Sequence, residues 1–293
     1  MKKFIVSDLH GNGNIYNSII KYLENVNKDD ELTLFINGDL IDRGIDSADI
    51  LLDVKKRINN KKGFNIKYLG GNHELMMYQT SVKRKDIYKW PHYSQWFYNG
   101  GDITANRLKE LIDIKEELEV IKFISECDIY YKFNEKLNDK QIVLVHAKCP
   151  KIVNDICNLK IKDNNREVFK SVWTREDDLS LILKDSLGND KYFTIIGHTP
   201  VLDKKGYSYY KEYNCLNIDG GCGAYAYGYV NYDHTPLVEI DDKNNRLIIL
   251  TFNNSNEITY GNYFSDDKSI QMNNEELAKK RKYISKDIKK QSI

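Results

Sequence analysis

Residues 32–44 read Leu-Thr-Leu-Phe-Ile-Asn-Gly-Asp-Leu-Ile-Asp-Arg-Gly, an apolar stretch followed directly by charged side chains. The first five residues are typical of a buried β-strand. Asp39, Asp42 and Arg43 therefore come where a strand ends and a loop begins. Carboxylates beside an arginine at such a position indicate a site that binds both cations and anionic groups.

The same pattern, polar side chains directly after an apolar β-like stretch, recurs at four other places along the chain. These places contribute Asp8 with His10, Asn72 with His73, His146, and His198. Carboxylate, amide and imidazole ligands favour divalent cations and argue against a thiolate or redox site. The sequence therefore predicts a centre of two divalent metal ions, which is typical of enzymes that hydrolyse phosphate esters.

The first 75 residues alternate between β-like and helical stretches, which predicts an α/β fold with a parallel sheet covered on both faces. The expected strands are 3–7, 31–36 and 64–69, and the expected helices are 15–26 and 47–58. In such sheets, ligands bind beyond the carboxyl ends of the strands. Asp8, Asp39 and Asn72 all follow those ends, so the predicted fold and the predicted site agree.

Residues 76–128 are rich in aromatic and charged side chains and have a mostly helical pattern. We expect a helical insertion beside the metal site, with Asp102 as the N-cap of one helix. A second β-rich half follows, and its closely spaced late strands suggest an antiparallel or mixed second sheet packed on the first. The expected strands are 129–133, 141–145, 192–196, 215–218, 237–240, 246–252 and 258–263.

The chain is expected to form one catalytic domain over residues 1–265, with the insertion within it, and a tail over 266–293. Lysine and arginine dominate the tail from residue 279 onward. We expect the tail to be basic, partly helical and poorly packed, as a solvated chain end; contact with an anionic partner is the alternative.

Composition is that of a globular protein, because 41% of the 293 residues are hydrophobic. The net charge of +1 argues against stable nucleic-acid binding. No apolar stretch approaches the ~20 residues of a membrane span. The five cysteines are odd in number and lack metal-site spacing, and the apolar run at the N-terminus stops at Ser7, too early for an export signal. Together these features predict a cytoplasmic protein with reduced thiols.

Asp39 is suited to bridge the two cations, with one carboxylate oxygen on each and the ions ~3.5–4 Å apart. Asp8 and His10 are two residues apart at the end of a strand, so both can reach one ion. Asn72 offers a neutral amide oxygen, which suits a hard cation and leaves positive charge for the substrate.

Three further residues are expected to act on the substrate. Arg43 offers a planar fork of donors for phosphate oxygens, and Asp42 can orient an imidazole. His73 points away from Asn72 and is placed to be the general acid that protonates the leaving oxygen.

Arg175, in the run 172–175, is the candidate for a second phosphate clamp. It could instead pack on Trp173 or pair with Glu176. His92 and His234 have no assigned role, and both are expected to be ordinary loop or surface histidines.

The sequence leaves structural explanations open for the other residues. Asp8 could form a turn, Asn72 could cap a helix, and Asp42 with Arg43 could form a surface salt bridge. A single histidine after a buried strand, such as His146, is usually structural.

Five motifs together resemble the calcineurin-like metallophosphoesterase superfamily. They are Asp-Leu-His-Gly at 8–11, Gly-Asp-Leu-Ile-Asp-Arg-Gly at 38–44, Gly-Asn-His-Glu at 71–74, Val-His-Ala at 145–147 and Gly-His-Thr-Pro at 197–200. The resemblance covers roughly residues 3–240 and is strongest to the serine/threonine phosphoprotein phosphatases of bacterial and phage type. Trp96, Asn99-Gly100-Gly101, Thr104 and Trp173-Thr174-Arg175 also look like that branch.

The resemblance implies a β-sandwich of two mixed sheets flanked by helices. One metal ion would be held by Asp8, His10 and Asp39, and the other by Asp39, Asn72, His146 and His198. The phosphate would be held by Arg43, Arg175 and Asn72, and the acid pair would be His73 with Asp42. The expected metal is manganese, with iron or zinc as alternatives.

The expected reaction is a single in-line displacement on a phosphomonoester, in which water activated between the two cations attacks phosphorus. The expected substrate is phosphoserine or phosphothreonine in a protein, or a small phosphoester. The loop at 217–223 with Tyr225 and Tyr227 also resembles diadenosine tetraphosphate hydrolases, so that activity is the alternative. An inactive scaffold is disfavoured, because every expected ligand and the acid are present.

Overall fold

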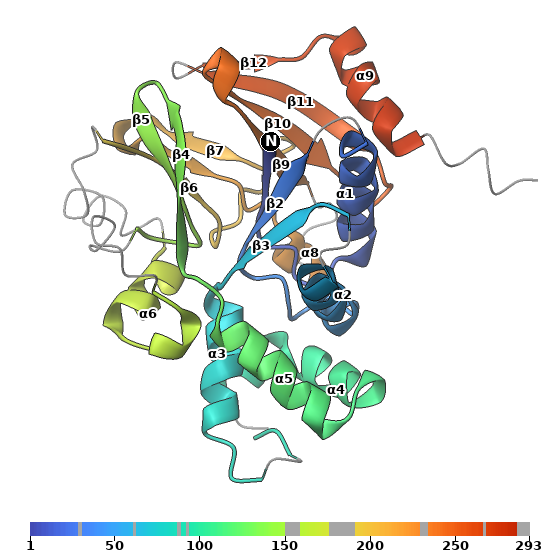
Figure 1. Cartoon of the computed structure of the whole chain (residues 1–293), viewed down its shortest axis with the longest axis vertical. Coiled ribbons are helices and arrows are strands. Elements are labelled where there is room, and N and C mark those ends of the chain that lie inside the picture. The colour runs from blue at the N-terminus through green and yellow to red at the C-terminus, as the bar shows by residue number, and fades with distance from the viewer. Residues whose placement is uncertain are drawn as a thin grey trace, which may run out of the picture.

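The computed structural model describes residues 1–28, 31–60, 63–86, 89–91, 94–149, 159–175, 191–228, 234–265 and 268–285. In these residues two β-sheets pack face to face, and helices lie outside one sheet and at one end of the pair (Figure 1). The predicted class, a sandwich of two mixed sheets flanked by helices, is confirmed.

The N-terminal part of the first sheet is built as the sequence predicts. Strands β1 (Lys2–Val6), β2 (Leu32–Asn37) and β3 (Asn65–Leu69) are parallel and are connected by helices α1 (Gly13–Val26) and α2 (Ser47–Asn60). Both crossovers step in the same direction across the sheet, so their common handedness places both helices on one face. Successive strand residues point to opposite faces, and the other face is covered by the second sheet.

Four late strands extend this first sheet. They are β9 (Thr235–Asp241), β10 (Arg246–Phe252), β11 (Ile258–Ser265) and β12 (Lys268–Gln271). The sheet order is β12-β11-β10-β9-β1-β2-β3. The prediction that these late strands belong to the second sheet is therefore wrong. Because β2 pairs with only one edge of β1, the opposite edge is open, and β9 pairs with it in antiparallel register, with Ile5 opposite Val238.

The second sheet has the order β4-β5-β6-β8-β7 and is mixed. Its strands are β4 (Tyr130–Leu137), β5 (Lys140–Val145), β6 (Tyr192–Ile196), β7 (Ser208–Tyr210) and β8 (Cys215–Asn217). Apolar side chains of both sheets form one core between them, to which Ile5 and Phe35 contribute from the first sheet and Phe133, Leu144 and Ile195 from the second. Burial of this shared core holds the two sheets together.

The predicted helical insertion is present beyond the carboxyl ends of the parallel strands (Figure 1). It contains α3 (Asn72–Val82), the π-helical turn η1 (Phe97–Gly101), α4 (Asp102–Leu111) and α5 (Ile114–Ser125). Asp102 is the first residue of α4, and Gly101 takes the N-cap position expected for Asp102.

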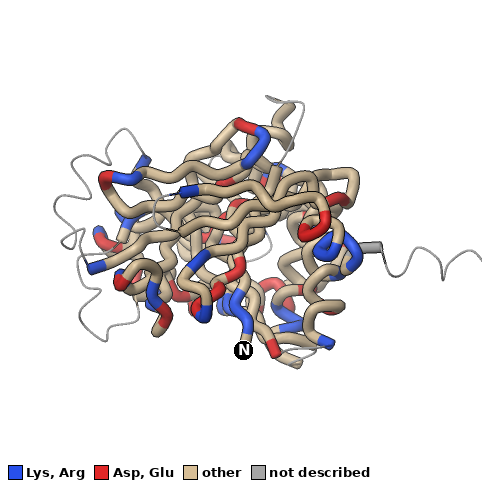
Figure 2. The backbone as a smooth tube through the Cα atoms, turned by 90° about the horizontal axis from the view of Figure 1, so that it is seen from above, with Lys and Arg blue, Asp and Glu red and all other residues tan. Residues whose placement is uncertain are grey.

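Shorter elements complete the described fold. They are η2 (Ile161–Asp163), α6 (Arg166–Trp173), η4 (Lys211–Tyr213), α8 (Cys222–Ala226) and η5 (Asp242–Asn244). Basic and acidic residues are interspersed along the described chain (Figure 2). No helix in the described part of the chain is long and apolar enough to cross a membrane.

The segment expected to be a poorly packed tail is folded onto the domain over residues 268–285. Helix α9 (Asn274–Ser285) follows β12 and packs beside α1 and β11. Leu277 is buried in the core between the first sheet and the helices that cover it. Lys280 forms an ion pair with Glu239 at 3.0 Å. The prediction of poor packing is wrong for this segment, because Met272 and Leu277 are buried and Tyr283 packs against the same core. Residues 286–293 lie outside the described part.

The substitution Leu277→Ala should lower the free energy of unfolding by about 2 kcal/mol, since it removes a buried side chain from the core. Urea denaturation measures the change. Lys279→Ala, on the exposed side of the same helix, is the control and should change stability by less than about 0.5 kcal/mol. Equal, small changes in both variants would mean that α9 is only loosely attached.

Candidate metal centre

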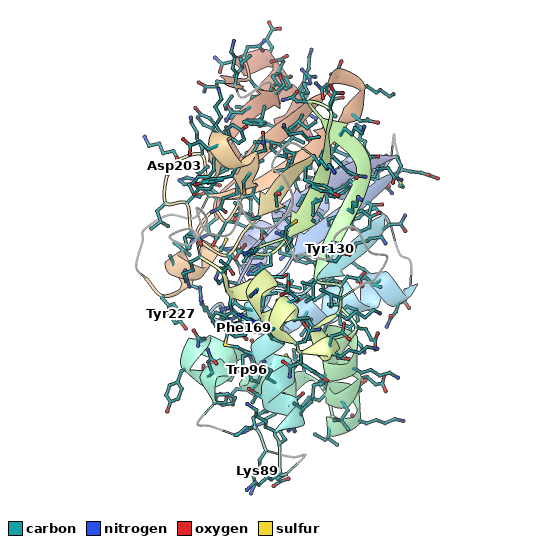
Figure 3. All side chains as sticks on the ribbon, turned by 90° about the vertical axis from the view of Figure 1, so that its left-hand side faces the viewer. Lys89, Trp96, Tyr130, Phe169, Asp203 and Tyr227 are labelled. Atoms are coloured by element: carbon teal, nitrogen blue, oxygen red, sulfur yellow. The ribbon has the colours of Figure 1, made fainter. Side chains whose placement is uncertain are left out.

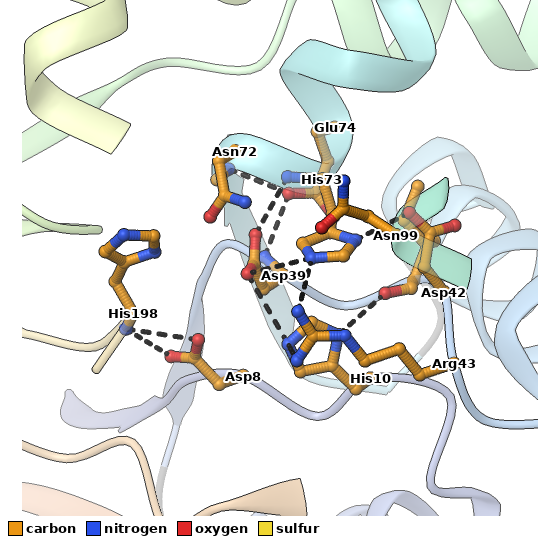
Figure 4. Close-up of polar contacts among 12 residues, drawn as sticks. Asp8, His10, Asp39, Asp42, Arg43, Asn72, His73, Glu74, Asn99 and His198 are labelled. Atoms are coloured by element: carbon orange, nitrogen blue, oxygen red, sulfur yellow. Dashed lines mark hydrogen bonds and ion pairs between the residues drawn. The ribbon is translucent and has the colours of Figure 1, made fainter. Parts of the chain in front are cut away.

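The site is formed by residues that follow five strands, three of the first sheet and two of the second. Figure 4 shows most of these residues side by side. Asp8 and His10 follow β1, Asp39 follows β2, and Asn72 and His73 open helix α3 after β3. His146 follows β5 and His198 follows β6, so the second sheet supplies two residues. The structure brings all of these residues together and buries every one of them.

The loops that carry these residues have an unusual backbone conformation. A positive φ occurs at six non-glycine residues of the site: Asp8 (54°), His10 (43°), Asp39 (49°), Asp42 (73°), Arg43 (72°) and His198 (71°). This left-handed region disfavours side chains with a β-carbon, and each such residue costs roughly 1–3 kcal/mol. The surrounding packing must supply that energy, and in return the side chains all turn into the site.

Asp39 lies at the centre of the site with its two oxygens facing different histidines. Oδ2 is 3.5 Å from His10 Nε2, and Oδ1 is 3.4 Å from His146 Nε2. Two groups of potential ligand atoms result, His10–Asp39–His73 and Asp39–His146–His198, each within 4.8 Å of one another. A carboxylate shared in this way is suited to bridge two cations.

Backbone carbonyls fix the orientation of two imidazoles. His10 Nδ1 is 3.0 Å from the Ile41 carbonyl oxygen, and His146 Nδ1 is 2.8 Å from that of Asn37. A carbonyl oxygen only accepts hydrogen bonds, so each Nδ1 carries the proton and each Nε2 faces Asp39. The ring nitrogen that could bind a cation is thereby selected before any cation arrives.

His198 has a buried ring nitrogen that lacks a protein partner. Its Nε2 makes no hydrogen bond to the described residues, and a buried polar atom in that condition is unfavourable. Burial, together with the nearby His146, lowers the pKa of His198 to about 3, so its lone pair is free at neutral pH. A divalent cation would use this lone pair, and the carboxylate, amide and imidazole donors around it fit such an ion.

Asp8 and Asn72 also lie in the site. Asn72 Oδ1 is 3.1 Å from His146 Nε2, which places its amide oxygen beside the second ligand group. Asp8 accepts the backbone N–H of His198 on both oxygens at 3.1 Å, and the Ser7 hydroxyl also donates to it. Its carboxylate is therefore next to the ligand groups and turned toward His198 rather than inside either group.

Arg43 extends between two imidazoles of the first ligand group. Its guanidinium lies 3.3 Å from His10 Nε2 and 3.0 Å from His73 Nε2. The Tyr227 ring lies 5.3 Å from the guanidinium carbon, close enough for a cation–π contact. His73 Nδ1 is 2.7 Å from Asp42 Oδ2, and since the carboxylate only accepts, Nδ1 donates and Nε2 faces the site.

Two buried carboxylates in the site were not predicted as functional residues. Glu74 accepts the backbone N–H groups of Asp39 (2.9 Å), Leu40 (3.0 Å) and Gly71 (2.8 Å), and it thereby ties the β2 loop to the start of α3. Its place at the end of the Gly-Asn-His-Glu motif was the available signal. Asp219 follows β8, and burial, reinforced by the charge of Asp39, raises its pKa to about 6.

Arg175 lies at the exposed end of the segment that follows α6, near enough for its charge to lower the His198 pKa. The Trp173 ring lies 6.2 Å from the His198 ring. Glu176, the alternative partner of Arg175, and His92 lie outside the described residues. His234 packs on Gly220 and is in neither ligand group.

A pocket of about 260 Å³ reaches the site from the surface. His10 and Arg43 line its inner end, and Asp46, Tyr225 and Asn254 are among the residues of its walls. Of the candidate metal ligands, His10 is the one that lines this pocket, and the Arg43 side chain lines it as well.

Comparison with known proteins gives one matching family and several solved structures of similar fold. The family model of the calcineurin-like phosphoesterases matches residues 1–230. Comparison with curated proteins gave no significant match. A cold-active protein tyrosine phosphatase is similar in structure, with a TM-score of 0.51, 17% identity, and coverage of 94% of this chain and 80% of the other. A hypothetical protein from Pyrococcus horikoshii has a TM-score of 0.51 and 10% identity, with coverage of 85% and 87%. Identities this low support a shared fold and nothing finer.

Adding Mn²⁺ to the metal-stripped protein should raise its melting temperature by roughly 4–8 °C at a hundredfold excess over Kd, because a ligand bound only by the folded state stabilises it. Asp39→Asn should lose most of this shift, since the amide cannot offer two anionic oxygens. Glu110→Gln, on the exposed side of α4, is the control and should keep it. Two tightly bound ions per chain in Asp39→Asn would refute the bridging position.

Proposed function

Because the chain belongs to the calcineurin-like phosphoesterases, a family of metal-dependent enzymes, we propose that it hydrolyses phosphomonoesters at a centre of two divalent metal ions. We propose phosphoserine and phosphothreonine in proteins as its substrates. The observation that carries the proposal is the pair of ligand groups that share Asp39. Two groups that meet on one carboxylate fit two adjacent cations better than a single structural ion.

The ligand assignment follows the resemblance, although in the structure His73 rather than Asp8 is grouped with His10 and Asp39. Asp8, His10 and Asp39 would hold one ion, and Asp39, Asn72, His146 and His198 the other. When bound, the ions would lower the pKa of water from 15.7 toward about 7 and neutralise charge on the phosphate. We propose manganese as the metal, as the resemblance implies, with iron or zinc as alternatives. The carboxylate and imidazole donors are compatible with all three.

Arginine and amide groups would hold the phosphate. Arg43 already lies between His10 and His73, so a phosphate at the ligand groups would meet its guanidinium fork. Arg175 lies near enough to His198 for its charge to act on that imidazole. The two guanidinium groups would neutralise the equatorial oxygens of the phosphate. The Asn72 amide would position the same group, and positioning of this kind orients phosphorus for an in-line reaction.

His73 would supply the proton. Its Nδ1–H is held by Asp42, and its Nε2 points into the site, so Nε2 is the atom that would carry and release the proton. As water bonds to phosphorus on one side, the bond to the leaving oxygen breaks on the other, and Nε2 protonates that oxygen. The displacement is single, so no phosphoenzyme forms.

A cytoplasmic location is part of the proposal. The four cysteines that the structure describes, Cys127, Cys149, Cys215 and Cys222, are buried and free of disulfides, as in a reducing compartment. A phosphorylated protein or a small phosphoester is the proposed partner, and stable nucleic-acid binding is not expected at a net charge of +1.

The proposal is tested by incubating metal-stripped protein, with and without Mn²⁺, with a phosphoserine peptide and with diadenosine tetraphosphate in parallel. Chromatography resolves the products. Mn²⁺-dependent phosphate release from the peptide is the expected result. Preferential release of ADP would replace the protein substrate by a dinucleotide, and inactivity toward both with Mn²⁺ would contradict the function.

His73→Asn should lower turnover of a phosphoserine peptide roughly 10²–10³-fold and turnover of p-nitrophenyl phosphate much less. The reason is that nitrophenolate is stable enough to leave as an anion, whereas a serine alkoxide must be protonated as it leaves. His234→Asn is the matched control, because His234 is in neither ligand group, and it should leave both rates unchanged. Equal losses on the two substrates would argue against the acid role of His73.

A further inference from the structure

The carboxylate of Asp42 is held from its far side by two donors of the helical insertion. Trp96 Nε1–H donates to Oδ2 at 2.7 Å, and the Thr104 hydroxyl donates to Oδ1 at 2.6 Å. The Thr104 hydroxyl also accepts the Asp42 backbone N–H at 3.1 Å. All three residues are fully buried, so no water competes for these bonds.

The insertion reaches the neighbouring residue as well. The backbone N–H of Arg43 donates to the Gly100 carbonyl oxygen at 3.3 Å. Asp42 and Arg43 both have left-handed backbone conformations, which are unfavourable without outside support. One short segment of the insertion, residues 96–104, thus fixes the side chain of one residue and the backbone of the next (Figure 3 labels Trp96 among the helices of the insertion).

These bonds determine which way the carboxylate faces. Oδ2 receives two donors, Trp96 Nε1–H and His73 Nδ1–H, each at 2.7 Å, and Oδ1 receives the hydroxyl of Thr104. A carboxylate held at both oxygens cannot rotate about its Cβ–Cγ bond without breaking a buried hydrogen bond, which costs roughly 1–3 kcal/mol. The bond to His73, and with it the direction of His73 Nε2, is therefore set by Trp96 and Thr104.

We propose that Trp96 and Thr104 are positioning residues for protonation of the leaving group, and that the helical insertion serves to hold the Asp42–His73 pair in its working orientation. The inference rests on the proposed function, because it requires His73 to be the acid. Neither residue touches the substrate, so both act through Asp42.

A second tryptophan of the insertion, Trp90, is a control that distinguishes the positioning role of Trp96 from a packing role. Trp90 is buried like Trp96, and their ring centroids are 4.7 Å apart. Its Nε1–H, however, has no hydrogen-bond partner among the described residues, and Arg84 stacks on its ring. Replacing either tryptophan by phenylalanine keeps an aromatic ring and removes one N–H, but only at position 96 does that N–H hold Asp42.

The test compares turnover of a phosphoserine peptide and of p-nitrophenyl phosphate by the Mn²⁺-loaded full-length protein. Trp96→Phe should lower peptide turnover about 10-fold, the effect of one lost hydrogen bond of about 1.4 kcal/mol, and nitrophenyl phosphate turnover less than about 2-fold. Thr104→Val, of similar volume and without a hydroxyl donor, should do the same. Trp90→Phe should leave the ratio of the two rates unchanged, even if it lowers the melting temperature.

A double-mutant cycle makes the dependence on His73 explicit. In a His73→Asn background, Trp96→Phe should have less than about a 2-fold further effect on peptide turnover, because the acid through which it acts is already absent. Full additivity there, or equal losses on both substrates in Trp96→Phe and Thr104→Val, would overturn the inference. If Trp96→Phe fails to fold, Thr104→Val decides alone.

The outcomes also separate this inference from the proposed function. Wild-type protein that hydrolyses neither phosphomonoester contradicts the proposed function itself. Active wild-type protein in which His73→Asn changes the ratio of the two rates, while Trp96→Phe and Thr104→Val do not, keeps the function and rejects only the positioning role.

Discussion

The buried carboxylate of Asp39 is the interaction on which the rest of the site depends. Burial alone would raise its pKa, but the charges of His146 and His73 outweigh burial and hold the pKa well below its usual range. The backbone N–H of His73 donates to Asp39 Oδ1 at 3.0 Å, and the Glu74 carboxylate accepts the backbone N–H of Asp39. A buried charge is tolerable only with such compensation, so the loops after β2 and β3 must meet for either to be stable.

The same constraint explains why the site needs both sheets. Asp39 comes from the first sheet, whereas His146 and His198 come from the second, and the core between the sheets sets the distance between them. Loosening that core would therefore separate the two ligand groups. Six residues of the site have a left-handed backbone conformation, and the packing of the sandwich offsets the strain of these conformations.

The helical insertion links packing to chemistry in a second way. Its sequence pattern predicted helices beside the site, but its contact with Asp42 depends on a tryptophan and a threonine that are far along the chain from residue 42. Asp219 was missed for a similar reason, because a lone carboxylate in a sequence carries no sign of being buried. Glu74 ends a recognisable motif, but its three backbone N–H partners are evident only in the structure. Likewise, α9 looked like part of a solvated chain end because it contains four consecutive basic residues, 279–282.

Local sequence patterns determined the candidate ligands and most of the strands and helices, because hydrophobic periodicity and the position of polar residues after strands act over a few residues. The short strands β7 and β12 were not predicted. Only the tertiary structure decided that β9 to β12 join the first sheet, since pairing with the open edge of β1 depends on backbone hydrogen bonds common to any strand. It also decided that Asp39 faces His10 with one oxygen and His146 with the other. The contact with His146 joins residues more than a hundred positions apart. The distance in space between these two residues is fixed by the packing of the two sheets.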